Sequence, residues 1–309
     1  HVLALAAAQA ARGDDVTIVH AHGESASIPG VRALRATAAV LGELAADVVH
    51  VHGRPLAAEA EEAFAAGHPV VRSLHDFSFG CATGEHWFRG GAPCTRAHGP
   101  GCLAAIATRG CAHRLDIRRS LARYAAVGRE LPLARAADEV VVYSDVVRSA
   151  ALANGIDPAR CHVVPYFAAR AERPVPLPPG RGIVFAGRIV GAKGLDLALR
   201  ALALDPGAWD ELVVAGDGWD RPRCERLAAS LGIGSQVRFT GWQDAAGLDR
   251  TLRAARLVVL PSRWPEPFGI AGIEALALGR PVVGARVGGI PEWLEDGVGG
   301  FLFEPGDAG

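Results

Sequence analysis

Several features that define whole classes of protein are missing from this chain of 309 residues. No apolar run approaches the roughly 18 residues that cross a membrane, and 38 glycines and 20 prolines without a three-residue period exclude collagen. With 32 basic and 33 acidic residues the net charge is −1, so no overall basic field attracts nucleic acid. Six cysteines are too few for a disulfide scaffold of this length. The composition predicts a globular protein without a nucleic-acid partner.

Methionine and lysine are the scarcest residues. The absence of methionine predicts that further residues precede His1. Lys193 is the only lysine among the 32 basic side chains. Because a compact ammonium and a planar guanidinium are not interchangeable, we expect Lys193 to be present for its shape as well as its charge. The opening His1–Ala4 lacks the charged region of a signal peptide, which predicts a cytoplasmic protein with reduced thiols.

Short β-branched runs alternate with Ala- and Leu-rich stretches, as in α/β proteins with parallel sheets. A helix is expected at 2–11, and strands are expected at 15–19, 46–52, 69–74, 137–143, 182–186, 212–215, 236–240, 257–260 and 281–284. The length and the 50% apolar content allow two cores. Since such domains open with a strand, we expect a first strand before His1 to be missing, and likewise a last helix after Gly309.

A stretch rich in proline divides the chain. Residues 171–182 contain four prolines and no periodicity, which is typical of an interdomain linker. We therefore expect a Rossmann-like N-terminal domain over 1–170, with a cysteine-rich insertion at 80–113, and a second Rossmann-like domain over 183–309. Two doubly wound parallel-sheet domains facing across a cleft are the predicted architecture, and the cleft is the default ligand site.

The turn after the first strand of the second domain carries two cations and three glycines. It runs G-R-I-V-G-A-K-G from Gly187 to Gly194 and leads into a helix. Backbone N–H groups approach an anion closely at such a turn, and the helix dipole favours negative charge there. Arg188 and Lys193 add positive charge. The turn predicts a phosphate site, with an ordinary solvated turn as the alternative.

Two glutamates lie eight residues apart in E-P-F-G-I-A-G-I-E. Pro267 disfavours helix at Glu266, so Glu266 is expected in a loop while residues 268–270 open a helix. At 1.5 Å per residue, Glu274 lies about 7.5 Å beyond Gly269 along the helix axis. The free N–H groups of the first helical turn and the two carboxylates suit a ligand with an anionic group and several hydroxyls. Ordinary helix-start acids are the alternative for either glutamate alone.

These segments resemble the retaining family 4 glycosyltransferases, which have the GT-B fold. The resemblance rests on E-x7-E at 266–274 and G-R-I-V-G-A-K-G at 187–194. Further motifs follow in the family's order: V-V-A-G-D-G at 213–218, V-R-F-T-G-W at 237–242, G-G-I-P-E at 288–292 and E-D-G-V-G-G-F-L-F-E-P-G-D at 295–307. In the first domain, D-V-V-H-V-H-G at 47–53 and S-L-H-D at 73–76 also match. The resemblance spans nearly the whole chain.

The resemblance implies a role for each matching residue. It makes four residues catalytic, namely His75, Arg188, Lys193 and Glu266. The donor-binding residues that it implies are Gly187, Arg188, Lys193, Gly216, Asp217, Trp242, Glu266, Phe268, Gly269, Ile270 and Glu274. In these sets the two cations bind the diphosphate, Glu274 binds the ribose and Glu266 binds the donor sugar. His75 faces the sugar, with a purely structural histidine as the alternative.

By the same resemblance, the chain is expected to be a hexosyltransferase-type enzyme that retains the anomeric configuration and needs no cofactor and no catalytic metal. A UDP-, GDP- or ADP-sugar is the expected donor. The expected acceptor is a hydroxyl of a glycan, a lipid-linked molecule or a small molecule. A sugar-nucleotide epimerase on the same fold and a non-catalytic sugar-nucleotide-binding module are the alternatives. The oligomeric state is not predicted.

Four cysteines gather in the expected insertion. Cys81, Cys94, Cys102 and Cys111 are separated by 12, 7 and 8 residues, without any C-x2-C pair. A structural zinc site, a disulfide and reduced thiols all stay open as interpretations. Downstream, Arg114, Arg118, Arg119, Arg123 and Arg129 form a basic helical stretch. A solvated face, an anionic acceptor and peripheral contact with the inner face of a membrane are its three interpretations.

Overall fold

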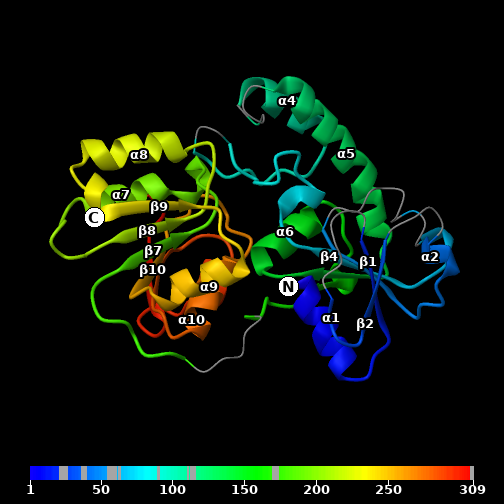
Figure 1. Ribbon diagram of the computed structural model, residues 1–309. Coiled ribbons are helices and arrows are strands. Elements are labelled where there is room, and N and C mark those ends of the chain that lie inside the picture. Colours follow the sequence, from blue (N-terminus) through cyan, green and yellow to red (C-terminus); the bar gives the residue numbers. More distant parts are fainter. Residues whose placement is uncertain are drawn as a thin grey trace. The chain divides into compact units, whose positions relative to one another are not determined.

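The computed structural model describes residues 1–20, 27–35, 40–53, 61, 64–88, 91–109, 111, 116–168 and 174–306. The chain forms two compact units (Figure 1). The first comprises His1–Gly84, Arg96–Thr108 and Ala112–Ala169, and the second comprises Glu85–Thr95, Arg109–Cys111 and Arg170–Gly309. The expected insertion at 80–113 is thus divided between the units. Arg114 of the expected basic stretch, residues 171–173 of the expected linker and residues 307–309 lie outside the described residues.

The first unit contains two parallel sheets. A two-stranded sheet pairs β1 (Val16–His20) with β2 (Val31–Arg35). The other sheet has the order β3-β4-β5-β6, with β3 (Val49–Val51), β4 (Val70–Leu74), β5 (Glu139–Val142) and β6 (Cys161–Val163). Its described helices are α1 (Val2–Ala11), α2 (Val40–Glu43), η1 (Phe77–Phe79), α4 (Pro100–Thr108), α5 (Ile117–Ala136), α6 (Asp145–Ala153) and η2 (Pro158–Arg160).

The second unit is built on one parallel sheet of order β12-β11-β10-β7-β8-β9. Its strands are β7 (Ile183–Ala186), β8 (Leu212–Ala215), β9 (Val237–Gly241), β10 (Leu257–Leu260), β11 (Val282–Ala285) and β12 (Gly300–Phe303). Its described helices are η3 (Gly191–Lys193), α7 (Leu195–Leu202), α8 (Arg221–Ser230), η4 (Gly234–Gln236), α9 (Ala245–Arg253), α10 (Ile270–Ala277) and η5 (Ile290–Glu292).

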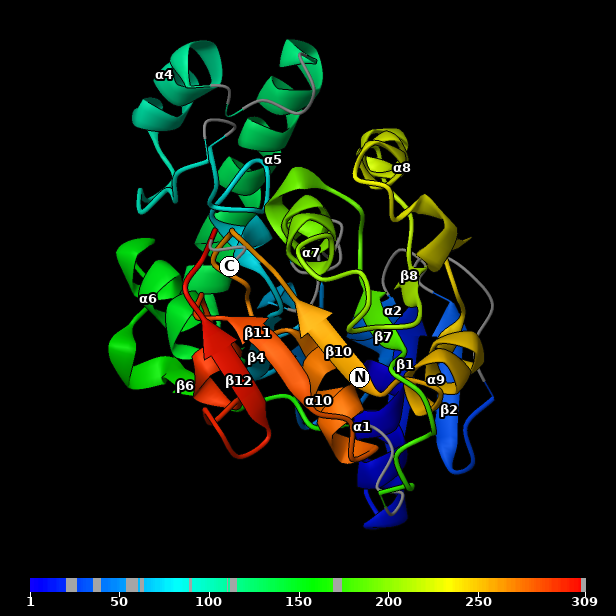
Figure 2. The same ribbon diagram turned by 90° about the vertical axis from the view of Figure 1, so that its left-hand side faces the viewer.

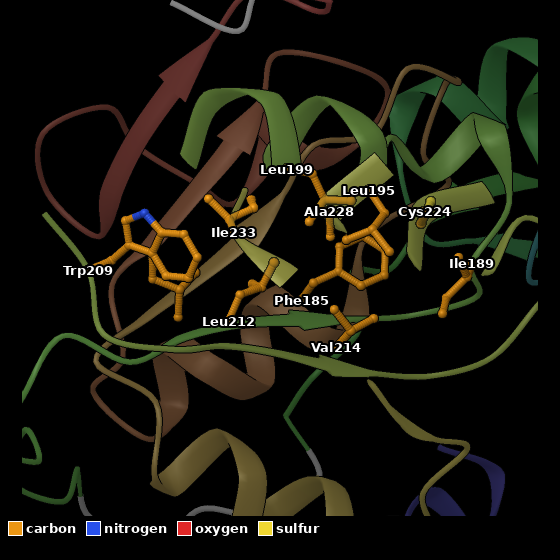
Figure 3. Close-up of a cluster of buried hydrophobic side chains, with 11 residues drawn as sticks. Phe185, Ile189, Leu195, Leu199, Trp209, Leu212, Val214, Cys224, Ala228 and Ile233 are labelled. Atoms are coloured by element: carbon orange, nitrogen blue, oxygen red, sulfur yellow. The ribbon is translucent and has the colours of Figure 1, made fainter. Parts of the chain in front are cut away.

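Apolar side chains cover both faces of this sheet. On one face, Phe185 and Val214 pack with Leu195 and Leu199 of α7 and with α8, as Figure 3 shows. On the other face, the alternate strand residues pack with α9 and α10 (Figures 1 and 2). Burial on both faces explains the near-continuous apolar runs of these strands.

The order of the strands reverses between β7 and β10. From β7 the chain winds outward to β8 and β9, then crosses back to β10 on the other side of β7 and continues to β11 and β12. Ligands of such sheets bind beyond the carboxyl ends of the strands at this reversal. The loops that follow β7 and β10 are 187–194 and 261–269. The topology therefore brings together the two loops that carry the predicted phosphate turn and Glu266.

The prediction of an α/β protein with parallel sheets in two domains is confirmed. The helix predicted at 2–11 coincides with α1. Strands β2, β6 and β12 were not predicted. No described helix reaches the length and apolarity needed to span a bilayer.

Candidate functional site

The loop after β7 lies against the end of β10. Gly194 follows η3 with φ +71° and precedes α7. A Cβ added at Gly194 would overlap the carbonyl oxygen of Pro261, so only glycine allows the two backbones to approach this closely. The N–H of Arg263 donates to the carbonyl oxygen of Ala192 at 2.8 Å. The loop of Lys193 and the loop of Glu266 are therefore joined through their backbones.

A partly buried ion pair supports this junction. The guanidinium of Arg263 donates to both carboxylate oxygens of Asp196, at 2.5 and 3.2 Å. Asp196 lies in the first turn of α7 and is buried. Burial alone would raise the pKa of Asp196, but Arg263 and Arg223 outweigh it and the net shift is downward. Sequence analysis singled out neither Arg263 nor Asp196, because their pairing depends on the tertiary fold.

Lys193 and Glu266 form the centre of the site. The ammonium of Lys193 donates to both carboxylate oxygens of Glu266, at 2.8 Å to Oε1 and 2.7 Å to Oε2. Ser262 Oγ and Trp264 Nε1 donate to Oε2 at 2.8 and 2.9 Å. Oε2 therefore accepts three of these hydrogen bonds and Oε1 accepts one.

The pair is ionised although it is largely withdrawn from solvent. Glu266 is only 6% exposed. Burial alone would raise its pKa, but the charge of Lys193 and the hydrogen bonds from Lys193, Ser262 and Trp264 outweigh it and lower the pKa. The Lys193 ammonium also lies 5.2 Å from the ring centre of Trp264, within range of a cation–π interaction. The Glu266 carboxylate is thus an anion that Lys193, Ser262 and Trp264 stabilise.

The helix after Glu266 begins later than expected. α10 starts at Ile270, not at Phe268, because Gly269 adopts the left-handed conformation with φ +90°. The carbonyl oxygen of Phe268 accepts a hydrogen bond from Trp293 Nε1 at 2.6 Å. Glu274 lies about one turn inside the helix and is half-buried. The predicted helix start is wrong by two residues, whereas the order of the loop, helix start and Glu274 is as predicted.

The other predicted cation lies in the same loop as Lys193. Arg188 Nη1 is 3.9 Å from Glu85 Oε1, which belongs to the 85–95 segment of this unit. Burial raises the pKa of Glu85, and the charges of Arg188 and Lys193 partly offset this rise. The Arg188 side chain is 52% exposed. The Arg188 side chain is therefore more accessible to an anion than that of Lys193, which is 20% exposed.

The remaining predicted nucleotide residues follow β8 and β9. A Cβ added at Gly216 would overlap the carbonyl oxygen of Gly187, so the turns after β7 and β8 touch. Asp217 accepts a hydrogen bond from the N–H of Gly218 at 2.7 Å. Trp242 is 74% exposed. Since all these strands are parallel, these residues lie at the same edge of the sheet as Lys193 and Glu266.

His75 lies in the first unit, directly after β4, among aromatic rings. Its Nε2 and Nδ1 of His52 share a hydrogen bond of 3.1 Å, and its Nδ1 is hydrogen-bonded to the hydroxyl of Tyr166. Its ring stacks on Tyr143 with centroids 4.8 Å apart. Burial lowers the pKa of His75 to about 4, and the charge of Arg72 contributes to this shift.

His50 and His52, which lie in the motif at 47–53, extend this group. Burial lowers the pKa of His52 to about 3, with a further contribution from His50. The pKa of His50 is lowered by burial and by Arg72. His50 Nε2 is 2.9 Å from the hydroxyl of Ser73. The imidazoles of this group are therefore neutral at neutral pH, and those of His52 and His75 share a hydrogen bond.

The four cysteines of the expected insertion are divided between the two units. Cys81 and Cys102 belong to the first, and Cys94 and Cys111 belong to the second. None of them forms a disulfide. Among the residues that the structure describes, which include all four, no group of three or more His, Cys, Asp or Glu side chains could hold a metal. The expectation of a structural zinc site is not supported.

Residues 174–309 match the family described as glycosyl transferases group 1, and this part of the chain belongs to that family. The D-inositol 3-phosphate glycosyltransferase of Mycobacterium tuberculosis H37Rv is 33% identical over 273 residues. The match covers 80% of this chain and 55% of that enzyme. The chain therefore spans about half the length of the curated relatives that it matches. The family resemblance of the sequence motifs is confirmed.

Solved structures agree with this assignment of the fold. HepE of Anabaena, solved in complex with UDP-glucose, superposes with a TM-score of 0.61 at 22% identity, over 85% of this chain and 66% of that one. Sucrose-phosphate synthase of Thermosynechococcus elongatus superposes with a TM-score of 0.62 at 23% identity, over 98% and 79% of the two chains. The predicted GT-B fold is confirmed.

Proposed function

We propose that this chain forms the core of a retaining glycosyltransferase that moves a sugar from a nucleotide sugar to a hydroxyl acceptor. The observation that carries the proposal is the Lys193–Glu266 pair, which lies where the strand order of the second unit's sheet reverses. The pair holds an ammonium beside a carboxylate in front of α10, which supports a site where a cation binds a diphosphate and a carboxylate binds sugar hydroxyls. Membership of residues 174–309 in the glycosyl transferases group 1 family supports the same function.

The donor lies at the carboxyl ends of the strands in the sheet of the second unit. Arg188, Lys193 and the backbone of the turn from Gly187 bind its diphosphate, and Glu274 accepts from the ribose hydroxyls. The sugar lies against Glu266 and the backbone of residues 268–270. Gly216, Asp217 and Trp242 border the nucleotide. A UDP-sugar is the first donor to test, because HepE was solved with UDP-glucose.

The proposed reaction breaks the bond between the anomeric carbon and the phosphate oxygen, and its electron pair leaves with the diphosphate. The acceptor oxygen forms the new bond on the same face of the sugar. The acceptor proton passes to the departing phosphate oxygen. Arg188 and Lys193 stabilise the charge that grows on the diphosphate. His75, kept neutral by its surroundings, hydrogen-bonds a hydroxyl without adding charge.

Donor binding is expected to rearrange the central pair. Diphosphate oxygens and the Glu266 carboxylate are competing acceptors for the ammonium of Lys193. When the diphosphate draws the ammonium away, Oε1 loses the hydrogen bond that it accepts from Lys193, while Oε2 keeps those from Ser262 and Trp264. Oε1 is then the oxygen that accepts from a sugar hydroxyl.

Calorimetric titration of the full-length protein with UDP tests both parts of this proposal. Arg188→Ala and Glu274→Ala are expected to weaken UDP binding by about tenfold or more, because each removes a charged partner. Glu266→Gln removes the rival anion, so UDP should bind about threefold or more tightly. Arg200→Ala, on an exposed position of α7, is the control and should leave the affinity unchanged.

The possible results separate the two ideas. Wild-type UDP affinity in both Arg188→Ala and Glu274→Ala would contradict the donor site itself. Weaker or equal UDP binding by Glu266→Gln, with the other two variants impaired as expected, would contradict only the competition for Lys193. A thermal-shift series with UDP-, GDP- and ADP-sugars then identifies the base.

A further inference from the structure

Positive charge is concentrated in one segment of the chain, most of which belongs to the first unit. Residues 96–136 contain eight arginines and two acidic residues, Asp116 and Glu130, a formal balance of +6. The whole chain carries −1, so the other residues carry −7. The near-neutral composition therefore conceals a strongly basic region, which ends with α5.

The first half of α5 turns apolar side chains toward solvent. Its inward face is buried through Ser120, Val127, Leu131 and Ala134. Ile117, Leu121 and Ala125 recur every four residues and so share another face, which we call the α5 stripe. All three are exposed, Ile117 by 58% and Leu121 by 44%. A row of exposed apolar residues on one helix face marks an interaction surface more often than single exposed residues do.

Arginines border the α5 stripe. At 100° per residue, Arg118 and Arg129 lie on the side of the helix next to it, and both are exposed. The nearby acid, Asp116, caps the helix by accepting from the N–H of Arg119 at 2.9 Å. Helix α4 lies beside the start of α5 in both views (Figures 1 and 2) and exposes Leu103 by 40%. The surface thus combines apolar side chains with an excess of cations.

We propose that the α5 stripe and its bordering arginines dock on an anionic lipid membrane. Arginines beside the stripe are attracted to lipid phosphates, while Ile117 and Leu121 enter the boundary between headgroups and acyl chains. An apolar helix face flanked by arginines is the pattern of helices that lie in this interface. The contact is peripheral, and it stands independently of the donor site in the second unit.

Flotation of the full-length protein with vesicles tests the proposal. Vesicles of phosphatidylcholine with phosphatidylglycerol should carry the protein at low salt, and vesicles of phosphatidylcholine alone should not. Ile117→Ser/Leu121→Ser should lower partitioning by about tenfold, and Arg118→Gln/Arg129→Gln should lower it by about tenfold or more. Since all four side chains are exposed, the variants should keep the wild-type melting temperature.

Matched controls come from other surfaces of the chain. Val298→Ser/Phe301→Ser removes apolar side chains that are 75% and 64% exposed beside Glu295, Asp296 and Glu304. Arg12→Gln/Arg200→Gln lowers the net charge by the same two units as the test pair. Wild-type partitioning in both controls, with loss in both test variants, supports the proposal. No binding of the wild type to anionic vesicles, or equal losses in test and control variants, overturns it.

Discussion

The two units hold their polar clusters in opposite electrostatic states. In the second unit, Lys193 and Glu266 are both charged, and the buried carboxylate is stabilised by four hydrogen bonds. In the first unit, burial keeps His52 and His75 neutral, with pKa values of about 3 and 4. One cluster neutralises charge by pairing, whereas in the other burial and the charge of Arg72 keep the imidazoles neutral.

This difference suits two kinds of ligand group. A paired cation can be transferred to an incoming anion, since the new partner replaces the old one. Neutral imidazoles and tyrosine hydroxyls form hydrogen bonds with hydroxyl groups without bringing charge of their own. The charged cluster is therefore suited to a diphosphate, and the neutral cluster to sugar or acceptor hydroxyls.

The largest loss of stability is expected from a substitution that forces apart the two backbone segments beside the charged cluster. Gly194→Ala places a Cβ against the carbonyl oxygen of Pro261 at φ +71°. We expect the free energy of unfolding to fall by about 4 kcal/mol, because backbone must move and strain is added. Gly232→Ala is the matched control, with φ +76° and open space around the Cβ, and should cost about 1–2 kcal/mol. Urea unfolding of both variants measures the difference, and equal costs would contradict the close approach.

The next effect comes from removing one member of the pair. Lys193→Ala leaves the Glu266 carboxylate buried without its cation, which should cost about 3 kcal/mol of stability. Adding Glu266→Gln to that variant removes the unpaired charge and should recover most of the loss. A double-mutant cycle by urea unfolding measures this coupling. If the losses of stability from Lys193→Ala and Glu266→Gln simply add, Lys193 and Glu266 do not stabilise the fold as a pair.

The smallest effect concerns the neutral cluster and its response to pH. The pKa of His75 is lowered from 6.5 to about 4, so between these values the unfolded chain binds a proton that the folded chain does not. Stability should therefore fall as the pH drops from about 6.5 to about 4. In His75→Gln this fall should be smaller by about 1–2 kcal/mol, allowing for the partial exposure of the ring.

Glu266→Gln is the control for this pH dependence. Because the pKa of Glu266 is lowered from 4.5, its stabilising contribution is present above pH 4.5 and is lost only as the pH falls below it. Its replacement should leave the change from pH 6.5 to about 4.5 as in the wild type. Thermal melting across this range compares the three proteins, and a wild-type slope in His75→Gln would contradict the neutral state of His75.

Sequence patterns could predict most strands of the second unit's sheet, and the loops where its strand order reverses, because both depend on local signals. The run at 183–186 is β-branched and apolar, and Pro267 fixes Glu266 in a loop. The three-residue strand β6 is too short to give such a signal, and β2, V-R-A-L-R, mixes charged with apolar residues. α10 starts late because Gly269 takes a conformation that its residue type permits but does not require.

The donors around Glu266 could not be predicted in the same way. Ser262 and Trp264 are ordinary residues of a loop, and their hydrogen bonds to Oε2 depend on how residues 261–266 fold over η3. The salt bridge from Arg263 to Asp196 joins residues far apart in sequence. Likewise, the contacts among His52, His75 and Tyr166 arise from three separate segments. No local pattern in the sequence marks these pairs.

The single lysine has a practical consequence for chemical labelling. Within these 309 residues Lys193 carries the only side-chain primary amine, so acylating reagents and aldehydes have one ε-amino target. That amine forms an ion pair with Glu266 and its side chain is only 20% exposed, which slows its reaction. The extent of modification therefore reports directly on the state of the Lys193–Glu266 pair. The other 31 residues of the Lys and Arg count are arginines, which have no primary amine for these reagents.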